Sequence, residues 1–349
     1  MIEVFDVSNS GHRRYFNVEL VKTLCEVADV VYRTFNIPKD IADRIKYSGG
    51  IIEDLGRLSV NKVQKFIELS RCINNINKLG GDIVVYPFVD DLLLYNIDYK
   101  HKKVIGFLHN IPSSIIKRIK LKEMGRLKIV VLDDTIKEKL VSLGLSDKQI
   151  NVVEYPLECL LDLSKRESIK NEVYTFLYFG GTWKYKGLDI LLESLRYVKS
   201  RCRVIVAGRE TEITNKFILR KLKHIPNNIE VDLRLRFISD EEKLALYNTS
   251  DCVILPYRSS FTGMSIVLLE SLLMNKPVIC SSLDVFKKYI NIYSCGKIFK
   301  AESVMDLAFT IDNMVMYGID VEWGTIDKEL RDRSIRRFRS EIKEIVNGG

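Results

Sequence analysis

The sequence has no apolar run near the ~18 uninterrupted residues that a membrane-spanning helix needs. Its first residues, MIEVFDVSNSGHRRYF, lack the basic segment and the apolar stretch of a secretory signal peptide. Short-period repeats and low-complexity tracts are absent as well. We therefore expect a folded chain with no signal peptide and no transmembrane helix.

Cysteine is sparse and scattered. The seven cysteines are odd in number, and none belongs to a CxxC pair. Cys252 and Cys280 lie within apolar runs, where a reduced cysteine behaves as a small apolar residue. A reducing compartment is therefore predicted, and we expect a cytoplasmic protein. The sequence has neither zinc-ligand spacing nor interleaved aromatic and basic residues, so no nucleic-acid partner is predicted.

Length and composition indicate a folded protein of two domains. The chain has 349 residues, which exceeds the size of roughly 250–300 residues at which one hydrophobic core stops growing. Apolar residues make up 46% of the chain and charged residues 29%, as in a folded, soluble protein. The formal net charge of +8 favours a phosphate-bearing small molecule, a nucleic acid or an anionic membrane, and does not choose among them.

Short apolar runs alternate with longer segments of helical period, which is typical of α/β domains with mainly parallel sheets. The first half predicts a helix over 18–28 and another that ends at Gly144. Its predicted strands cover 2–7, 82–88, 104–109, 128–132 and 151–154.

A charged segment without a strong strand signal, near 157–172, is the predicted linker. The alternation then restarts, with strands over 174–179, 202–207, 253–255 and 278–280 and helices over 188–197, 240–248 and 265–274. We expect one nucleotide-binding type of domain over 1–160 and a second over 172–325. A C-terminal helix over 326–349 is expected to pack back on the first domain.

The segment from Asp251 to Ser282 predicts a strand, a polar loop with Gly263 and a helix that begins near Ser265. Free backbone N–H groups and the positive end of the helix dipole then lie at the carboxyl edge of a sheet, where a diphosphate can bind. Glu270, further along this helix, could accept two hydrogen bonds from a ribose diol. On spacing alone, a surface glutamate on an ordinary α/β turn remains the alternative.

The segment from Tyr174 to Leu195 predicts a strand, the pair Gly180-Gly181, a short basic loop and a helix preceded by Lys186. Lys186 can neutralise charge on a departing phosphate, while the glycines keep side chains out of the way. The alternative is a simple turn with a solvated lysine.

Taken together, these two segments resemble the family-4 retaining glycosyltransferases, and the resemblance covers most of Tyr174 to Lys300. FGGTWKYKG matches the start of the family's C-terminal domain, and TGMSIVLLESLLMNKPVI matches its later motif except for the first glutamate. The text RFISDEEKLALYNTSDCVILPY is similar to the family's base-binding stretch. The resemblance implies the GT-B fold, in which two Rossmann-like domains face a central cleft, with 1–160 on the acceptor side and 172–325 binding the nucleotide sugar.

By position, the resemblance implies that Lys186 contacts the diphosphate, that backbone around Ile238 meets the base and that Glu270 holds the ribose. The remaining donor-binding candidates lie in the two glycine loops: Gly180, Gly181, Lys184, Thr262, Gly263, Met264 and Ser265. Two positions depart from the family pattern. Thr262 replaces a glutamate that contacts the donor sugar, and Gly181 replaces an arginine for which Lys184 could substitute.

The first half resembles the family less closely. Gly11 lies where the family's glycine loop faces the substrates, and His109 resembles a histidine that approaches the donor sugar. The resemblance thus makes His109 and Lys186 the catalytic candidates. A structural histidine at a strand end is the alternative for His109. For His12, Arg13 and Arg14, contact with phosphate or acceptor is possible, but a solvated basic loop is the preferred interpretation.

The stretch from Ser113 to Lys128 is basic, with interleaved isoleucines. It is either a solvated helix face or an amphipathic helix on the anionic inner face of the membrane, where family members meet lipid-linked acceptors. The pairs Asp90-Asp91 and Asp133-Asp134 lack the spacing of a nucleotide-sugar metal site. No catalytic metal and no cofactor are predicted.

The resemblance thus implies a retaining, metal-independent glycosyltransferase that uses a nucleotide sugar such as a UDP- or GDP-sugar. The acceptor would be a hydroxyl of a glycan, a lipid-linked sugar or a small molecule. Lys186 and the helix start near Ser265 would stabilise the leaving diphosphate by fixed electrostatics. Two alternatives stay open: a GT-B epimerase or phosphorylase, and a non-catalytic binder of a sugar nucleotide or an anionic surface.

Overall fold

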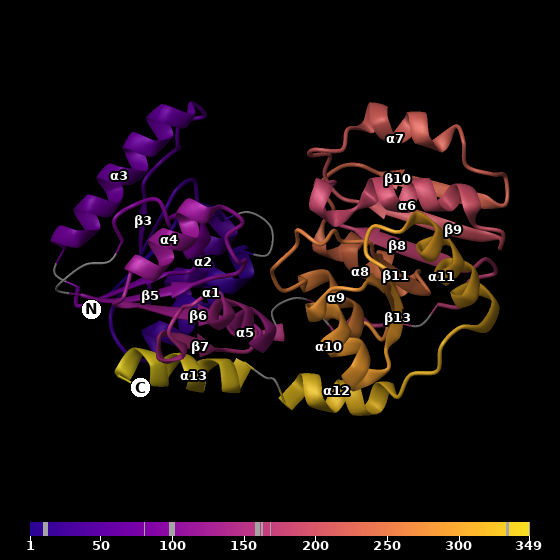
Figure 1. Ribbon diagram of the computed structural model, residues 1–349. Helices are drawn as coiled ribbons and strands as arrows, with labels where there is room; N and C mark the ends of the chain where they lie inside the picture. The colour runs from indigo at the N-terminus through magenta and orange to yellow at the C-terminus, as the bar shows by residue number, and fades with distance from the viewer. Residues whose placement is uncertain are drawn as a thin grey trace. The chain divides into compact units, whose positions relative to one another are not determined.

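The computed structural model describes residues 1–9, 13–79, 81–97, 102–157, 161, 163–167, 169–332 and 335–348. The chain forms two compact units (Figure 1). The N-terminal unit comprises Met1–Leu160 with Arg333–Gly349, and the C-terminal unit comprises Leu161–Asp332. Among the described residues, no helix has both the length and the apolar composition needed to cross a membrane.

Within its described residues, the N-terminal unit contains a parallel sheet of seven strands in the order β3-β2-β1-β4-β5-β6-β7. The strands are β1 Ile2–Asp6, β2 Val30–Thr34, β3 Ile51–Asp54, β4 Ile83–Tyr86, β5 Lys103–Phe107, β6 Leu127–Val131 and β7 Ile150–Val152. The inner strands are rich in β-branched residues and buried on both faces, as expected of a parallel sheet covered by helices. Strands β2 and β3 were not predicted from the sequence.

The helices of this unit are α1 Arg13–Cys25, α2 Lys39–Tyr47, α3 Lys62–Lys78, α4 Ile115–Glu123, α5 Asp134–Ser142 and α13 Ile335–Asn347. Side chains at their N-termini explain where several begin. Asn61 caps α3, Ser114 caps α4 and Asp133 caps α5, each by accepting a hydrogen bond from a backbone N–H of the first turn.

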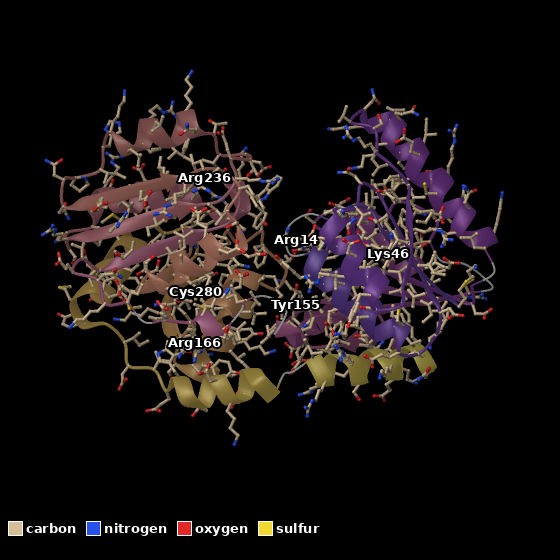
Figure 2. The ribbon with its side chains drawn as sticks, turned by 180° about the vertical axis from the view of Figure 1, so that it is seen from behind. Arg14, Lys46, Tyr155, Arg166, Arg236 and Cys280 are labelled. Carbon is tan, nitrogen blue, oxygen red and sulfur yellow. The ribbon has the colours of Figure 1, made fainter. Side chains whose placement is uncertain are left out.

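The C-terminal segment is two helices and not the single helix expected over 326–349. Helix α12 (Trp323–Asp332) belongs to the C-terminal unit, where Arg166 donates two hydrogen bonds of 2.8 Å to Asp327. Arg166 is labelled in Figure 2. Helix α13 belongs to the N-terminal unit, and its Arg339 pairs with Glu19 of α1 at 2.7 Å. The segment therefore divides its packing between the two units.

Within the part that the structure describes, the C-terminal unit has a parallel sheet of six strands in the order β10-β9-β8-β11-β12-β13. They are β8 Thr175–Phe179, β9 Cys202–Ala207, β10 Ile229–Arg234, β11 Cys252–Leu255, β12 Val278–Ser281 and β13 Gly296–Phe299. The helices, besides α12, are α6 Leu188–Ser194, α7 Asn215–Leu222, α8 Asp240–Asn248, α9 Ile266–Leu273, α10 Asp284–Tyr293 and α11 Val304–Tyr317.

Both sheets reverse their strand order in the middle, between β1 and β4 in one unit and between β8 and β11 in the other. In open parallel sheets, ligands bind beyond the carboxyl ends of the strands at such a switch point. The loops after β1, β4, β8 and β11 are therefore the places to look for binding sites.

Candidate functional site

The loop after β8 has a backbone that only glycine fits. Gly180 and Gly187 have φ angles of +114° and +69°, which L side chains rarely adopt. A Cβ added to Gly187 would lie 1.8 Å from the carbonyl oxygen of Pro256. A Cβ added to Gly180 would lie 2.4 Å from the ammonium of Lys186. The glycines thus let the end of β11 and the lysine approach the loop backbone closely.

Lys186 ends a single helical turn, Lys184–Lys186, and is half-buried. Its ammonium lies 5.5 Å from the centroid of the Tyr257 ring. Within the described parts of the chain, this ammonium has no hydrogen-bond or ion-pair partner. Burial lowers the pKa of Lys186, and the nearby Tyr185 and Glu270 oppose that shift. The loop therefore holds a cation with no counter-ion in the described part of the chain, which suits the binding of an anion.

Arg258, which follows β11, fixes the turn that carries Lys186. Its Nε donates to the carbonyl oxygen of Lys184 at 3.0 Å, and the carbonyl oxygen of Tyr185 accepts from its backbone N–H at 2.8 Å. Its guanidinium also pairs with Asp189 and Glu302. Sequence reasoning missed Arg258, because one arginine after a strand is not by itself a signal.

The other side of the same loop is pinned to the segment after β9. The Thr182 hydroxyl donates to the Ile213 carbonyl oxygen at 2.7 Å and accepts from the Thr211 N–H at 2.8 Å. Glu212 accepts from the backbone N–H of Lys184 at 2.8 Å. The Lys184 side chain is exposed, without an ion-pair partner among the residues described. Gly181 is half-buried, and a Cβ there would lie 3.0 Å from the Trp183 ring nitrogen.

Ser265 is the N-cap of α9, and its hydroxyl accepts from the Leu268 N–H at 3.3 Å. This agrees with the helix predicted to begin near Ser265. In the loop before it, Gly263 is buried, while Thr262 and Met264 are half-buried. The positive end of α9 therefore lies at the carboxyl edge of the sheet, beyond β11.

Glu270 is a buried residue of α9 with a 4% exposed surface, so it is not the surface glutamate of the alternative interpretation. One carboxylate oxygen accepts from the Lys243 ammonium at 2.8 Å, and the other accepts from the Tyr247 hydroxyl at 3.0 Å. Both partners lie on α8, four residues apart, on the face that packs against α9. Each carboxylate oxygen retains a further acceptor site for a ligand hydroxyl.

Ile238 lies in the loop between β10 and α8 and is half-buried. Ser239, the next residue, caps α8. The neighbouring Phe237 is exposed, and the Arg209 guanidinium lies 5.0 Å from its ring centroid. Since β8, β10 and β11 are parallel strands of one sheet, their following loops share an edge of the C-terminal unit.

His109, in the N-terminal unit, follows β5 and contacts the segment around Phe88. Its ring stacks on Phe88, with centroids 3.9 Å apart and planes at 12°. Its Nε2 lies 2.9 Å from the carbonyl oxygen of Pro87, so Nε2 is the donor, because a carbonyl oxygen only accepts. Its backbone N–H donates to Asp90. Gly11 and His12 lie outside the described residues.

Arg13 and Arg14 belong to the first turn of α1. The prediction that these residues form a solvated basic loop is therefore wrong for Arg13. The Arg13 guanidinium pairs with Asp91 at 2.7 Å and lies 4.2 Å from the Phe88 ring centroid. The Arg14 guanidinium donates to the hydroxyl of Tyr15 at 2.6 Å.

The acidic pairs have structural partners in the N-terminal unit. Asp90 accepts from the backbone N–H groups of His109 and Asn110, and burial raises its pKa to about 6. Asp91 pairs with Arg13, and Asp133 caps α5.

Residues 162–317 match the family described as glycosyl transferases group 1. The chain is also similar to the D-rhamnosyltransferase WbpZ of Pseudomonas aeruginosa, with 30% identity over 119 residues. This match spans 34% of the chain and 29% of the length of that enzyme.

Three solved structures have a similar fold. Anabaena Alr3699/HepE in complex with UDP and glucose has a TM-score of 0.75 and 12% identity, over 100% of this chain and 99% of that one. A glycosyltransferase from Rickettsia africae has a TM-score of 0.68 and 17% identity, over 100% and 99%. The lipopolysaccharide outer core galactosyltransferase WaaB has a TM-score of 0.69 and 12% identity, over 99% of each chain. These likenesses and the two parallel-sheet units confirm the predicted GT-B fold.

Proposed function

We propose that this chain transfers a sugar from a nucleotide sugar to an acceptor hydroxyl, because residues 162–317 match the family described as glycosyl transferases group 1. The observation that carries this proposal is the Lys186 ammonium, which has no counter-ion among the described residues and lies against the backbone of Gly180 at the carboxyl edge of β8. A diphosphate fits such a place. Similarly folded HepE binds UDP and UDP-glucose, which supports a nucleoside-diphosphate sugar as the donor.

The donor site we propose lies in the C-terminal unit. Lys186 and the N-terminus of α9 at Ser265 would bind the diphosphate, and backbone near Ile238 would meet the base. Glu270, oriented by Lys243, would accept from the ribose hydroxyls. The other contacts would come from the glycine loops that surround these groups: Gly180, Gly181, Lys184, Thr262, Gly263 and Met264.

The reaction we propose retains the configuration at the sugar and needs no metal. The acceptor oxygen forms a bond to the anomeric carbon as the bond from that carbon to the phosphate oxygen breaks. The acceptor proton passes to the departing phosphate oxygen. Lys186 then faces the negative charge that develops on the diphosphate. His109 remains a candidate contact for the sugar through atoms other than Nε2, which is bound to Pro87.

Contact with an anionic membrane belongs to the same proposal. Helix α4 exposes Ile115, Ile116 and Ile119, with 69%, 63% and 50% of their surfaces accessible. Basic residues such as Lys120 and Lys122 lie beside them on the same short helix. An exposed apolar strip with flanking lysines is typical of a helix that lies on anionic lipid, where a lipid-linked acceptor is reached.

A panel of nucleotide sugars tests this function. A bound donor should raise the melting temperature of the full chain by mass action, and the same donor should lose its sugar to an added acceptor. Conversion of the donor with no acceptor present would instead indicate an epimerase. If a nucleotide sugar stabilised the protein but no turnover were found, the protein would be a non-catalytic binder of the sugar nucleotide.

Treatment with EDTA tests the metal-free mechanism. We expect the transfer rate to be unchanged, because fixed cations and a helix terminus supply the positive charge. Loss of activity that manganese restores would contradict this mechanism.

A further inference from the structure

A cavity of about 800 Å³ lies in the N-terminal unit, and none of its lining residues belongs to the donor site described above. Its walls come from the segments after β1, β2 and β3, from the start of α3, and from the segment after β4. It therefore lies beyond the carboxyl ends of the strands, on either side of the switch point between β1 and β4. This is the usual position of a ligand site in an open parallel sheet.

The lining of the cavity is strongly basic. Arg13, Arg57, Lys62 and Lys65 line it, whereas Asp91 is its single acidic residue among those described. Asp91 is already paired with Arg13 at 2.7 Å. The other three cations have neither an ion pair nor a side-chain hydrogen bond within the described ranges. The cavity thus has three exposed cations that are available to bind an anion.

The rest of the lining is preorganised. The rings of Phe66 and Tyr95 stack with centroids 4.9 Å apart and planes at 25°. Asn36 has a φ of +49°, an uncommon conformation for a residue other than glycine. The carboxylate of Asp54 accepts from the backbone N–H groups of Asn36, at 3.0 Å, and Gly56, at 2.9 Å. One side chain therefore ties together the two loops that form this wall.

We propose that this cavity binds the acceptor through a phosphate or diphosphate group attached to a sugar. Arg57, Lys62 and Lys65 bind the phosphate oxygens, since arginine and lysine are the usual phosphate ligands. The Phe66 and Tyr95 rings and nearby amides line the space for the sugar, as in pockets that combine aromatic walls with a few polar groups. This inference rests on the proposed function and adds the chemical class of the acceptor.

Two sources present such a group, a soluble sugar phosphate and a sugar linked by diphosphate to a lipid. Val60, which precedes α3, and Val63 and Ile67 in its first turns are exposed, with 101%, 71% and 38% of their surfaces accessible. These apolar residues are neighbours of Lys62 and Lys65 in the sequence. A lipid chain would therefore contact them when its phosphate binds the two lysines. The enzymatic test below separates the two sources.

The anion site is tested in the full chain with inorganic pyrophosphate as the probe. Pyrophosphate should protect Lys62 and Lys65 from acetylation, read by mass spectrometry, while Lys186 reports on the donor site in the same sample. The variant R57Q/K62Q/K65Q should bind pyrophosphate at this site about tenfold or more weakly.

The matched control is K39Q/K46Q/K148Q, which removes the same charge from exposed lysines of the same unit that do not line the cavity. It should leave the protection unchanged. The anion site in the cavity would be overturned if pyrophosphate protected Lys186 alone. It would also be overturned if both triple variants bound pyrophosphate equally weakly.

The acceptor role is tested by transfer to a free sugar phosphate and to a lipid-diphosphate sugar in phosphatidylcholine vesicles. R57Q/K62Q/K65Q should raise KM about tenfold or more for whichever phosphate-bearing acceptor is used, and leave UDP affinity unchanged. If the same sugar without its phosphate were an equally good acceptor, the assignment of the cavity to a phosphate-bearing acceptor would be overturned. Failure of every nucleotide sugar to bind would refute the proposed function and the acceptor role, while pyrophosphate protection would still support the anion site.

Discussion

The two units differ in how they hold the cations that have no partner among the described residues. Lys186 is half-buried, close to glycine backbone and the Tyr257 ring, in a turn that Arg258 fixes. In contrast, Lys62 and Lys65 are exposed side chains on a helix that borders a large cavity. A cation in a fixed position stabilises the charge that develops in a transition state without first having to reorient. Cations on long, exposed side chains can instead adjust their positions to a bulky ligand. The first arrangement therefore suits the catalytic role proposed for Lys186, and the second suits the recognition role proposed for the cavity.

The largest effect is expected at the fixed cation. Lys186→Ala should lower kcat by about 10²–10³, with a smaller change in donor affinity, because the lost charge acts mainly on the transition state. Steady-state kinetics together with equilibrium binding of the donor measure both quantities. Lys184→Ala, in the same turn but exposed, is the matched control and should lower kcat far less. Equal losses of kcat and affinity in Lys186→Ala would make this residue a ground-state binder.

The backbone around Lys186 should be nearly as sensitive. Gly187→Ala should lower the free energy of unfolding by about 3 kcal/mol, because the new Cβ meets the Pro256 carbonyl oxygen and the φ angle is positive. Urea unfolding followed by tryptophan fluorescence reports on this unit, since Trp183 and Trp323 both belong to it.

Gly324→Ala is the control for that measurement. A Cβ at Gly324 meets nothing within 4 Å, so the stability should stay constant or rise slightly. If Gly187→Ala were as stable as the original protein, the loop would relax easily around the new Cβ. Lys186 would then not be held in a fixed position, and its contrast with the exposed Lys62 and Lys65 would fail.

Glu270 tests whether a buried, paired carboxylate still serves a ligand. Glu270→Ala should weaken binding of both the donor and the free nucleoside diphosphate by about tenfold to hundredfold, or ~1.5–3 kcal/mol, since ribose is common to both. Calorimetry measures both affinities under conditions in which the variant is folded, because the change removes the carboxylate that lies 2.8 Å from the buried Lys243 ammonium.

Tyr247→Phe removes a hydrogen bond from the same carboxylate but no proposed ligand contact. Its nucleotide affinity should therefore change little. A Glu270→Ala variant that loses turnover and retains nucleotide affinity would refute the ribose assignment.

Local features of these sites could be predicted from the sequence. The ranges 202–207 and 240–248 were predicted with the bounds that β9 and α8 have. Ser265 was placed at the start of its helix, because a cap and a helix start are decided by neighbouring residues. Strands β10 and β13 were missed, since IEVDLR and GKIF are half-exposed edge segments with weak apolar patterns.

Contacts between distant parts of the chain could not be predicted in the same way. Lys243 reaches Glu270 from 27 residues away, and Arg258 reaches the Lys184 carbonyl oxygen from 74 residues away. The cavity of the N-terminal unit joins residues from Val7 to Tyr95. No motif spans such distances, because the sheet order and not the sequence separation brings these side chains together.

The smallest effect is expected at α4, where exposed charges act on a membrane surface. The full chain should bind vesicles that contain anionic lipid and should be released as salt rises, since each nearby lysine or arginine contributes about 1 kcal/mol and salt screens it. The variant R118Q/K120Q/K122Q should lose this binding and retain nucleotide affinity. Lys117 is left unchanged, because its ammonium donates to the Asp90 carbonyl oxygen at 2.9 Å.

K39Q/K46Q/K148Q again controls for net charge and should still bind the vesicles. Cosedimentation with neutral and anionic vesicles measures the difference. Equal binding to both kinds of vesicle would point to the isoleucines alone, and no binding at low salt would return α4 to a solvated helix. In that second case the exposed cations of the N-terminal unit would act only at the cavity, and a soluble sugar phosphate would become the preferred acceptor.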